Sequence, residues 1–153
     1  VGHVARANPV WQQPAPSVFV FHGPQGYVSP SWYPGKQAHG KGVPTWNYAV
    51  VHAHGTPRVV DDRAALLAIV TRLTEHHEAA QAVPWRVDDA PREFIDQVLS
   101  AIVGIEVEVE RLVGKWKLSQ NRAAADRLGV VAGLQQLGGD DALALAALVE
   151  DPR

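Results

Sequence analysis

Residues 27–55 combine the side chains that a flat, phosphorylated ligand requires. Most of the tryptophans and tyrosines of the chain lie in this stretch: Tyr27, Trp32, Tyr33, Trp46 and Tyr48. Hydroxyl, amide and cationic side chains lie between the rings: Ser29, Ser31, Lys36, Lys41, Thr45 and Asn47. Aromatic rings stack on a planar group, hydroxyls and amides orient it, and cations pair with a phosphate.

The lysines point to a second stretch of the same character. Only four occur, at positions 36, 41, 115 and 117, and all lie in two short segments rich in aromatic residues. The second segment, KWKLSQN (115–121), adds Ser119, Gln120 and Asn121. If the two segments meet, they form a polar, cationic pocket floored by Trp46 or Trp116. The alternative is a pair of solvated lysine segments beside core tryptophans.

The histidines raise the question of a metal site. His52 and His54 alternate on a predicted strand and therefore point to one face, as two zinc ligands would. A third ligand could come from His22, His39 or Glu106. No compact His/Asp/Glu motif surrounds the pair, so packed or hydrogen-bonded histidines are the favoured interpretation and no metal is predicted.

Other catalytic patterns are absent from the sequence. It contains no G-x-S-x-G nucleophile turn, no G-x-G-x-x-G fingerprint and no Walker pattern, so no catalytic residue is predicted. The absence of cysteine excludes disulfides, thiolate nucleophiles and Cys-ligated metals.

Length and composition indicate one compact domain spanning residues 1–153, since the chain is 46% hydrophobic. The net charge of -2 lacks the excess of positive charge that an independent nucleic-acid-binding domain usually carries. No apolar run approaches the roughly 18 residues of a membrane span.

The order of expected elements predicts the fold class. Strands are expected at 1–5, 17–22, 27–29, 45–60 and 102–118, and helices at 62–80, from 91 onwards, and in a C-terminal helical part at about 121–150. Gly23-Pro24 should end the second strand, and Gly55 with Pro57 should form a bulge or tight hairpin. This order is not a regular βαβ alternation, so we expect an α+β fold with an antiparallel sheet closed, or nearly closed, into a barrel.

Six segments carry a family resemblance: HVARANP (3–9), FHGPQGYVSPSWY (21–33), GKGVPTWNYAVVHAHG (40–55), PWRVDDAP (84–91), VGKWKLSQNR (113–122) and ADRLGVVAGL (125–134). Together and in this order they resemble the PaiB-like family of FMN-binding negative transcriptional regulators. That family shares the split-barrel fold of the pyridoxamine-phosphate-oxidase-like flavoproteins.

The resemblance implies a cytoplasmic bacterial repressor, a homodimer of split β-barrels with FMN at the subunit interface, and DNA as a further partner. The matching cofactor positions are Ser29, Trp32, Tyr33, Lys41, Thr45, Trp46, Asn47, Lys117, Ser119, Gln120 and Asn121. By their chemistry, lysines and hydroxyls suit contacts with the phosphate, and amides suit contacts with the ribityl chain and the flavin edge. Aromatic rings suit contacts with the flavin face.

Family members usually carry a further region before the segment that matches residues 3–9. This chain begins almost at that segment. If the region is absent from the protein, we expect either an open barrel edge or an edge covered by the partner subunit, and if it is only cut away from this sequence, we expect the complete split barrel. Two alternatives remain open beside the non-enzymatic regulator. One is a flavin-dependent oxidoreductase, because the same fold hosts several chemistries. The other is a cofactor-free dimerisation module.

Overall fold

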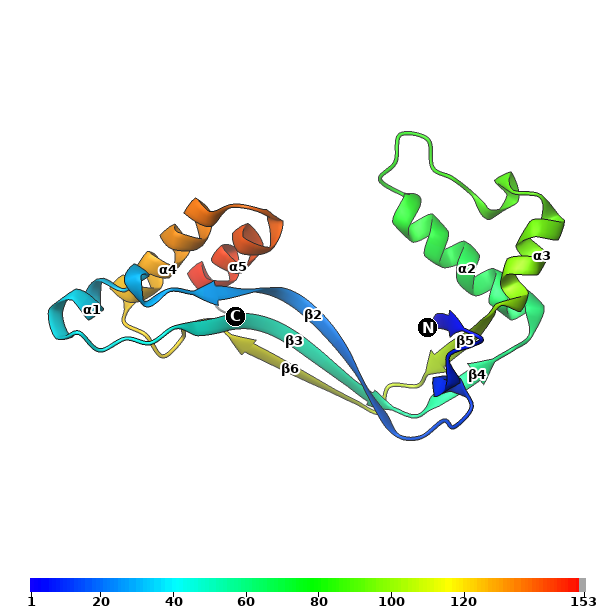
Figure 1. Ribbon diagram of the computed structural model, residues 1–153, viewed down its shortest axis with the longest axis horizontal. Coiled ribbons are helices and arrows are strands. Elements are labelled where there is room, and N and C mark those ends of the chain that lie inside the picture. Colours follow the sequence, from blue (N-terminus) through cyan, green and yellow to red (C-terminus); the bar gives the residue numbers. More distant parts are fainter. Residues whose placement is uncertain (152–153) are drawn as a thin grey trace. The chain divides into compact units, whose positions relative to one another are not determined.

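The chain adopts an α+β fold in a computed structural model that describes residues 1–151, apart from the side chains of residues 37–39. The strands are β1 (Gly2–Ala5), β2 (Ser17–Val28), β3 (Thr45–Gly55), β4 (Pro57–Val60), β5 (Ile102–Val107) and β6 (Arg111–Lys117). The α-helices are α1 (Pro34–His39), α2 (Arg63–Glu78), α3 (Arg92–Ser100), α4 (Ala124–Leu137) and α5 (Asp140–Glu150). Short 3-10 helices are η1 (Pro9–Trp11), η2 (Pro30–Trp32) and η3 (Val87–Asp89). Figure 1 shows these elements.

The elements group into two compact units. Unit 1 comprises residues 1–18 and 54–111, and unit 2 comprises residues 19–53 and 112–153. Strand pairing within the described residues gives two three-stranded sheets, β1-β5-β4 and β2-β3-β6, without a ladder that closes them into a barrel. The predicted α+β class with antiparallel sheets is confirmed.

Unit 1 packs α2 on its antiparallel sheet. The central strand β5 places Ile105 opposite Gly2 of β1 and opposite Val59 of β4. Asp62 caps α2, because its side chain accepts a hydrogen bond from the backbone N–H of Ala65 at 2.9 Å. The helix buries Leu66 and Ile69, and these side chains form its contact with the core.

Unit 2 holds the larger buried core, formed where α4 and α5 cover one end of its sheet (Figure 1). Val28 at the end of β2 and Leu118 just after β6 are fully buried together with Leu134 and Leu145 of the helices. A Cβ at Gly26 would lie 3.2 Å from Leu145, so α5 approaches β2 closely at this glycine.

Three strand predictions differ from the structure. The strand expected at 102–118 is two strands, β5 and β6, which belong to different sheets. β2 continues through Gly23 and Pro24 to Val28, because it is an edge strand, where a proline removes no ladder hydrogen bond. Gly55 and Pro57 form neither a bulge nor a hairpin. They mark the point where the chain leaves β3 in one sheet and enters β4 in the other.

Several apolar residues that repeat at helical or strand spacing in the sequence are exposed. Phe94 and Val98 of α3 and Leu128 of α4 face outward, and Val109 lies exposed between β5 and β6 rather than within the strand expected at 102–118. Helical spacing indicates only that apolar residues share a face, and a partner element has to cover that face before it is buried.

Candidate functional site

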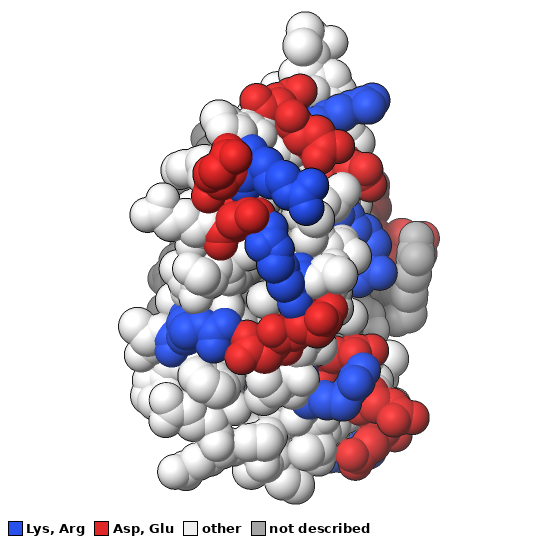
Figure 2. Space-filling model, turned by 90° about the vertical axis from the view of Figure 1, so that its right-hand side faces the viewer, with Lys and Arg blue, Asp and Glu red and all other residues white. Residues whose placement is uncertain are grey.

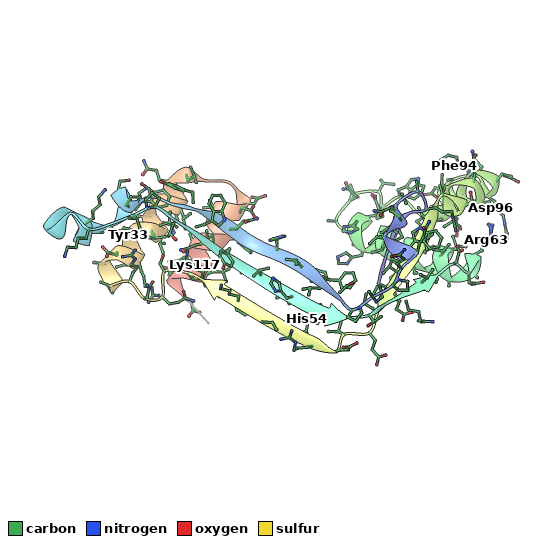
Figure 3. All side chains as sticks on the ribbon, turned by 60° about the horizontal axis from the view of Figure 1, so that its bottom comes forward. Tyr33, His54, Arg63, Phe94, Asp96 and Lys117 are labelled. Atoms are coloured by element: carbon green, nitrogen blue, oxygen red, sulfur yellow. The ribbon has the colours of Figure 1, made fainter. Side chains whose placement is uncertain are left out.

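The two lysine-bearing segments meet in unit 2. The Nζ atom of Lys117, the last residue of β6, donates a hydrogen bond to the main-chain carbonyl of Trp46 at 2.9 Å and another to the hydroxyl of Thr45. Figure 3 shows Lys117 at the end of its strand. An ammonium group has three donors, so one N–H of Lys117 remains for a further acceptor.

A buried pair of polar side chains joins the same two segments one residue further along. Asn47 is 0% exposed and Ser119 is 6% exposed, and the Nδ2 atom of Asn47 donates to the Oγ atom of Ser119 at 2.9 Å. The Oδ1 atom of Asn47 is buried and has no hydrogen-bond partner. Ser119 has a φ of 59°, a left-handed conformation that a serine adopts only under restraint.

Gln120 shapes the turn that follows. Its side chain accepts from the backbone N–H of Leu118 at 2.7 Å and donates to the carbonyl of Trp116 at 2.9 Å. Each end of this amide makes one bond to the main chain, so the predicted contact of Gln120 with a ligand would use the second N–H or the second lone pair of the exposed side chain. Asn121 is exposed at the tip of the turn.

Three predicted site residues lie beside α4 instead. Ser29 caps η2, because its Oγ atom accepts from the backbone N–H of Ser31. Trp32 packs on the core of α4 and α5, and Tyr33 is 2% exposed with a hydroxyl that has no partner. The sequence grouped these residues with Trp46 by composition. In the structure they support the helical core.

One arginine that the sequence reasoning left out connects the two groups. The guanidinium of Arg122 lies over the ring of Tyr33, with its Cζ atom 4.8 Å from the ring centroid. The backbone N–H of Arg122 donates to the carbonyl of Ser119 at 3.0 Å. Its position directly after KWKLSQN was the sequence signal that could have identified it.

The sheet and turn segments of unit 2 contain no carboxylate. Although the chain has 16 acidic residues, the first is Asp61, and residues 112–125 also contain none. Lys36, Lys41, Lys117 and Arg122 all lie in these acid-free stretches. Such segments favour an anion, since no internal carboxylate competes for the cations.

The histidines form no metal site in the part of the chain that the structure describes, where no three His, Cys, Asp or Glu side chains cluster. His54 contacts Arg111 instead, with Nη2 3.0 Å from Nε2. The side chain of His39 lies outside the described residues. Lys41 is exposed.

Comparison with known proteins identifies the family. A family model described as "Putative FMN-binding domain" matches residues 1–111. The chain belongs to this FMN-binding family.

Three relatives extend the likeness beyond the matched residues. A protein of Aspergillus fumigatus is 34% identical over 98% of this chain and 71% of its own length. A protein of Emericella nidulans is 36% identical over 86% of this chain and 57% of its own length. The "Protease synthase and sporulation protein PAI 2" of Bacillus subtilis is 34% identical over 98% of this chain and 71% of its own length. The resemblance to the PaiB-like family is thereby confirmed.

The donors of unit 2 fit the cofactor of this FMN-binding family. Lys117 retains one N–H, and the guanidinium N–H groups of Arg122 have no internal partner among the described residues, so both side chains can donate to a phosphate. The orphaned Oδ1 atom of Asn47 supplies a buried acceptor that no protein group uses. Trp46, which is 49% exposed, offers an open ring face for stacking.

Proposed function

We propose that this chain is an FMN-binding negative transcriptional regulator of the PaiB type. The observation that carries the proposal is the meeting of two separated cationic segments at Lys117, Thr45 and Trp46, inside stretches that lack carboxylates. The family match and the relative named for protease synthase and sporulation support the same conclusion. The whole chain would act as a single flavin-binding domain in the cytoplasm.

Within this proposal the predicted residues divide by role. Lys117 and the hydroxyl of Thr45 would approach the phosphate, and Trp46 would stack on the flavin ring. Asn47 and Ser119 would hold the end of β3 against the turn after β6, and Asn121 would reach the ligand from the tip of that turn. Lys41 is assigned to the phosphate by its chemistry alone.

The surface of unit 2 supports assembly with a second copy. Both edge strands of its sheet carry exposed apolar side chains: Val20 and Phe21 on β2, and Leu112, Val113 and Trp116 on β6. Exposed apolar side chains on an edge strand are a surface for pairing with another chain. A homodimer would cover these edges.

DNA enters the proposal through the family resemblance. On the face shown in Figure 2, Lys and Arg side chains are interspersed with Asp and Glu, so the described residues of this face form no purely cationic patch. An operator would therefore have to be contacted through another face or through surfaces that assembly creates.

No helix of the described residues is long and apolar enough to cross a membrane.

Native mass spectrometry and flavin titration test the proposal together. The purified protein should have the mass of a dimer, and its flavin-free form should quench the fluorescence of FMN at micromolar concentration. Lys117→Gln should weaken FMN binding, and Arg72→Gln on α2, which removes the same charge from unit 1, should leave it unchanged. A dimer that ignores FMN at this concentration would support the cofactor-free module instead.

A further inference from the structure

We propose that Arg122 binds the phosphate of the mononucleotide and thereby selects a phosphorylated flavin over an unphosphorylated one. This inference rests on the proposed function and assigns a residue to one part of the ligand. Arg122 lies outside the residues that the family model matches, which end at position 111.

The backbone of Arg122 is held in place by its neighbours. The hydrogen bond from its N–H to the carbonyl of Ser119, at 3.0 Å, closes a four-residue turn. Ser119 in turn has a left-handed φ of 59° and is fixed by the buried hydrogen bond from Asn47. Because both anchors are buried, the start of the Arg122 side chain has little freedom.

The guanidinium is held by a cation-π contact, which leaves its N–H groups available. It lies over the ring of Tyr33, a residue that is only 2% exposed. Stacking uses the flat face of a guanidinium, whereas hydrogen bonds use the N–H groups around its edge. In the described part of the chain those N–H groups have no hydrogen-bond or ion-pair partner, although the side chain is half-buried.

Other half-buried or paired arginines have an internal acceptor for at least one N–H group. Arg6, Arg58 and Arg63 form ion pairs with carboxylates. Arg127 of unit 2 donates through Nη2 to the carbonyl of Val149 at 3.0 Å, although its buried Nε has no partner. Arg122 differs from them because none of its guanidinium N–H groups has an internal partner among the described residues, and these groups are accessible to a ligand.

No carboxylate pairs with Arg122 among the described residues. Asp126, four residues further along the chain, accepts from the backbone N–H of Gly35 at 2.9 Å. The remaining acids of unit 2 lie at the two ends of α5, at Asp140, Asp141, Glu150 and Asp151. We assign the open donors of Arg122 to an external anion, because a phosphate monoester matches the fork of a guanidinium in two parallel hydrogen bonds.

Lys117 complements this role without duplicating it. Two of its three donors are already used by Thr45 and Trp46, so it can offer one further hydrogen bond. Arg122 supplies the bidentate geometry that an ammonium cannot provide. Loss of Arg122 should therefore affect phosphate binding more than a change of net charge alone would.

The test compares two ligands and three variants of the intact protein. FMN and riboflavin share the ring and ribityl chain and differ by the phosphate, and both are titrated by quenching of flavin fluorescence. Arg122→Gln should weaken FMN binding about tenfold or more and leave riboflavin binding within about twofold. Arg122→Lys should fall between wild type and Arg122→Gln. Arg72→Gln, which removes one exposed positive charge from unit 1, should change neither affinity.

The outcomes separate this inference from the proposed function. If wild type binds FMN and Arg122→Gln binds it equally well, or loses FMN and riboflavin in the same proportion, the phosphate role is overturned while the function stands. If the wild-type protein binds neither FMN nor riboflavin, the phosphate role of Arg122 and the proposed function are both overturned. Because Arg122→Gln also removes the stacking on Tyr33, its thermal unfolding is measured alongside. Arg122→Lys keeps a cation over the ring and decides the question if the glutamine variant does not fold.

Discussion

Close packing between Trp32 and two glycines should make α4 intolerant of even one added methyl group. A Cβ at Gly133 would lie 2.3 Å from Cδ2 of Trp32, and a Cβ at Gly129 would lie 1.9 Å from the carbonyl oxygen of the same residue. Real Cβ atoms do not approach heavy atoms this closely, so the substitutions Gly133→Ala and Gly129→Ala must displace either the indole or the helix.

Two effects of opposite sign decide the result. Replacing glycine by alanine inside a helix adds about 1 kcal/mol of stability when nothing else changes. Overpacking a filled core costs about 1–3 kcal/mol. Since both contacts are far inside van der Waals distance, we expect the upper part of that range, and a net loss of about 1–2 kcal/mol for either variant. For a chain of this size such a loss lowers the melting temperature by about 2–8 °C.

Urea unfolding followed by circular dichroism measures the change, with Ala132→Gly as the matched control. Ala132 is an exposed position on the same helix, so its replacement should lose about 1 kcal/mol through propensity alone. If Gly133→Ala instead stabilises the protein by the amount that Ala132→Gly destabilises it, the contact with Trp32 is not restrictive and the reasoning fails.

Repeating both substitutions in a Trp32→Leu variant distinguishes the cause of the cost at Gly133 from the cause at Gly129. Trp32→Leu removes the indole that opposes Gly133 and keeps the main-chain carbonyl that opposes Gly129. The cost of Gly133→Ala should therefore shrink in the Trp32→Leu background, and the cost of Gly129→Ala should persist. If Gly133→Ala lowers the free energy of unfolding equally in wild type and in Trp32→Leu, the loss arises within the helix and not from contact with the indole ring.

Two further predictions concern polar contacts. Ser119→Ala should destabilise the protein by about 1–3 kcal/mol, because it leaves Nδ2 of Asn47 buried without an acceptor. Ser119→Gly should be about 1 kcal/mol less damaging than Ser119→Ala, because glycine adopts the left-handed conformation freely. Urea unfolding of both variants checks this order of stability. The hydrogen bond from Arg6 lowers the pKa of Asp61 below its usual 3.8, so the stabilisation is present above the unfolded pKa and is lost as pH falls through the folded pKa. The difference in melting temperature between wild type and Asp61→Asn should therefore narrow on acidification, and a constant difference would contradict the assignment.

Local signals in the sequence were sufficient for α2 to α5, whereas the short helix α1 was not predicted. Asp61 or Asp62 before an apolar repeat indicates the start of α2, which Asp62 caps, and Gly138 with Gly139 indicates the end of α4. These features depend on residues within one or two turns of each other, so the sequence contains what determines them. The exposure of Phe94 depends on what lies against α3, and no local signal carries that information.

The course of the chain at Gly55 shows where local reasoning stops. A glycine followed closely by a proline interrupts a ladder in the same way whether the chain bulges, turns back or passes into another sheet. Only the pairing of β4 with β5, about 45 residues away in sequence, decides between these outcomes.

The sequence predicted that the two lysine segments could meet, but not how exposed each aromatic residue would be. Lysines placed only in two segments indicated that those segments meet, and the hydrogen bond from Lys117 to Trp46 joins them. Composition could not separate Trp46, which is half exposed, from Tyr33, which is 2% exposed. Gly133 of α4 is a signal for the packing of Trp32, because a Cβ there would lie 2.3 Å from the indole.

The distribution of acidic residues gives the anion site its physical basis. A chain with a net charge of -2 has enough carboxylates to pair every lysine and arginine, and unit 1 does pair Arg6, Arg58 and Arg63 in this way. In unit 2 the carboxylates are confined to the helices, and the acid-free sheet and turn keep Arg122 and one donor of Lys117 without an internal acceptor. An anion that binds there has no internal carboxylate to displace from these donors. The absence of acids from the sheet and turn should therefore be one source of the affinity of the protein for a phosphate.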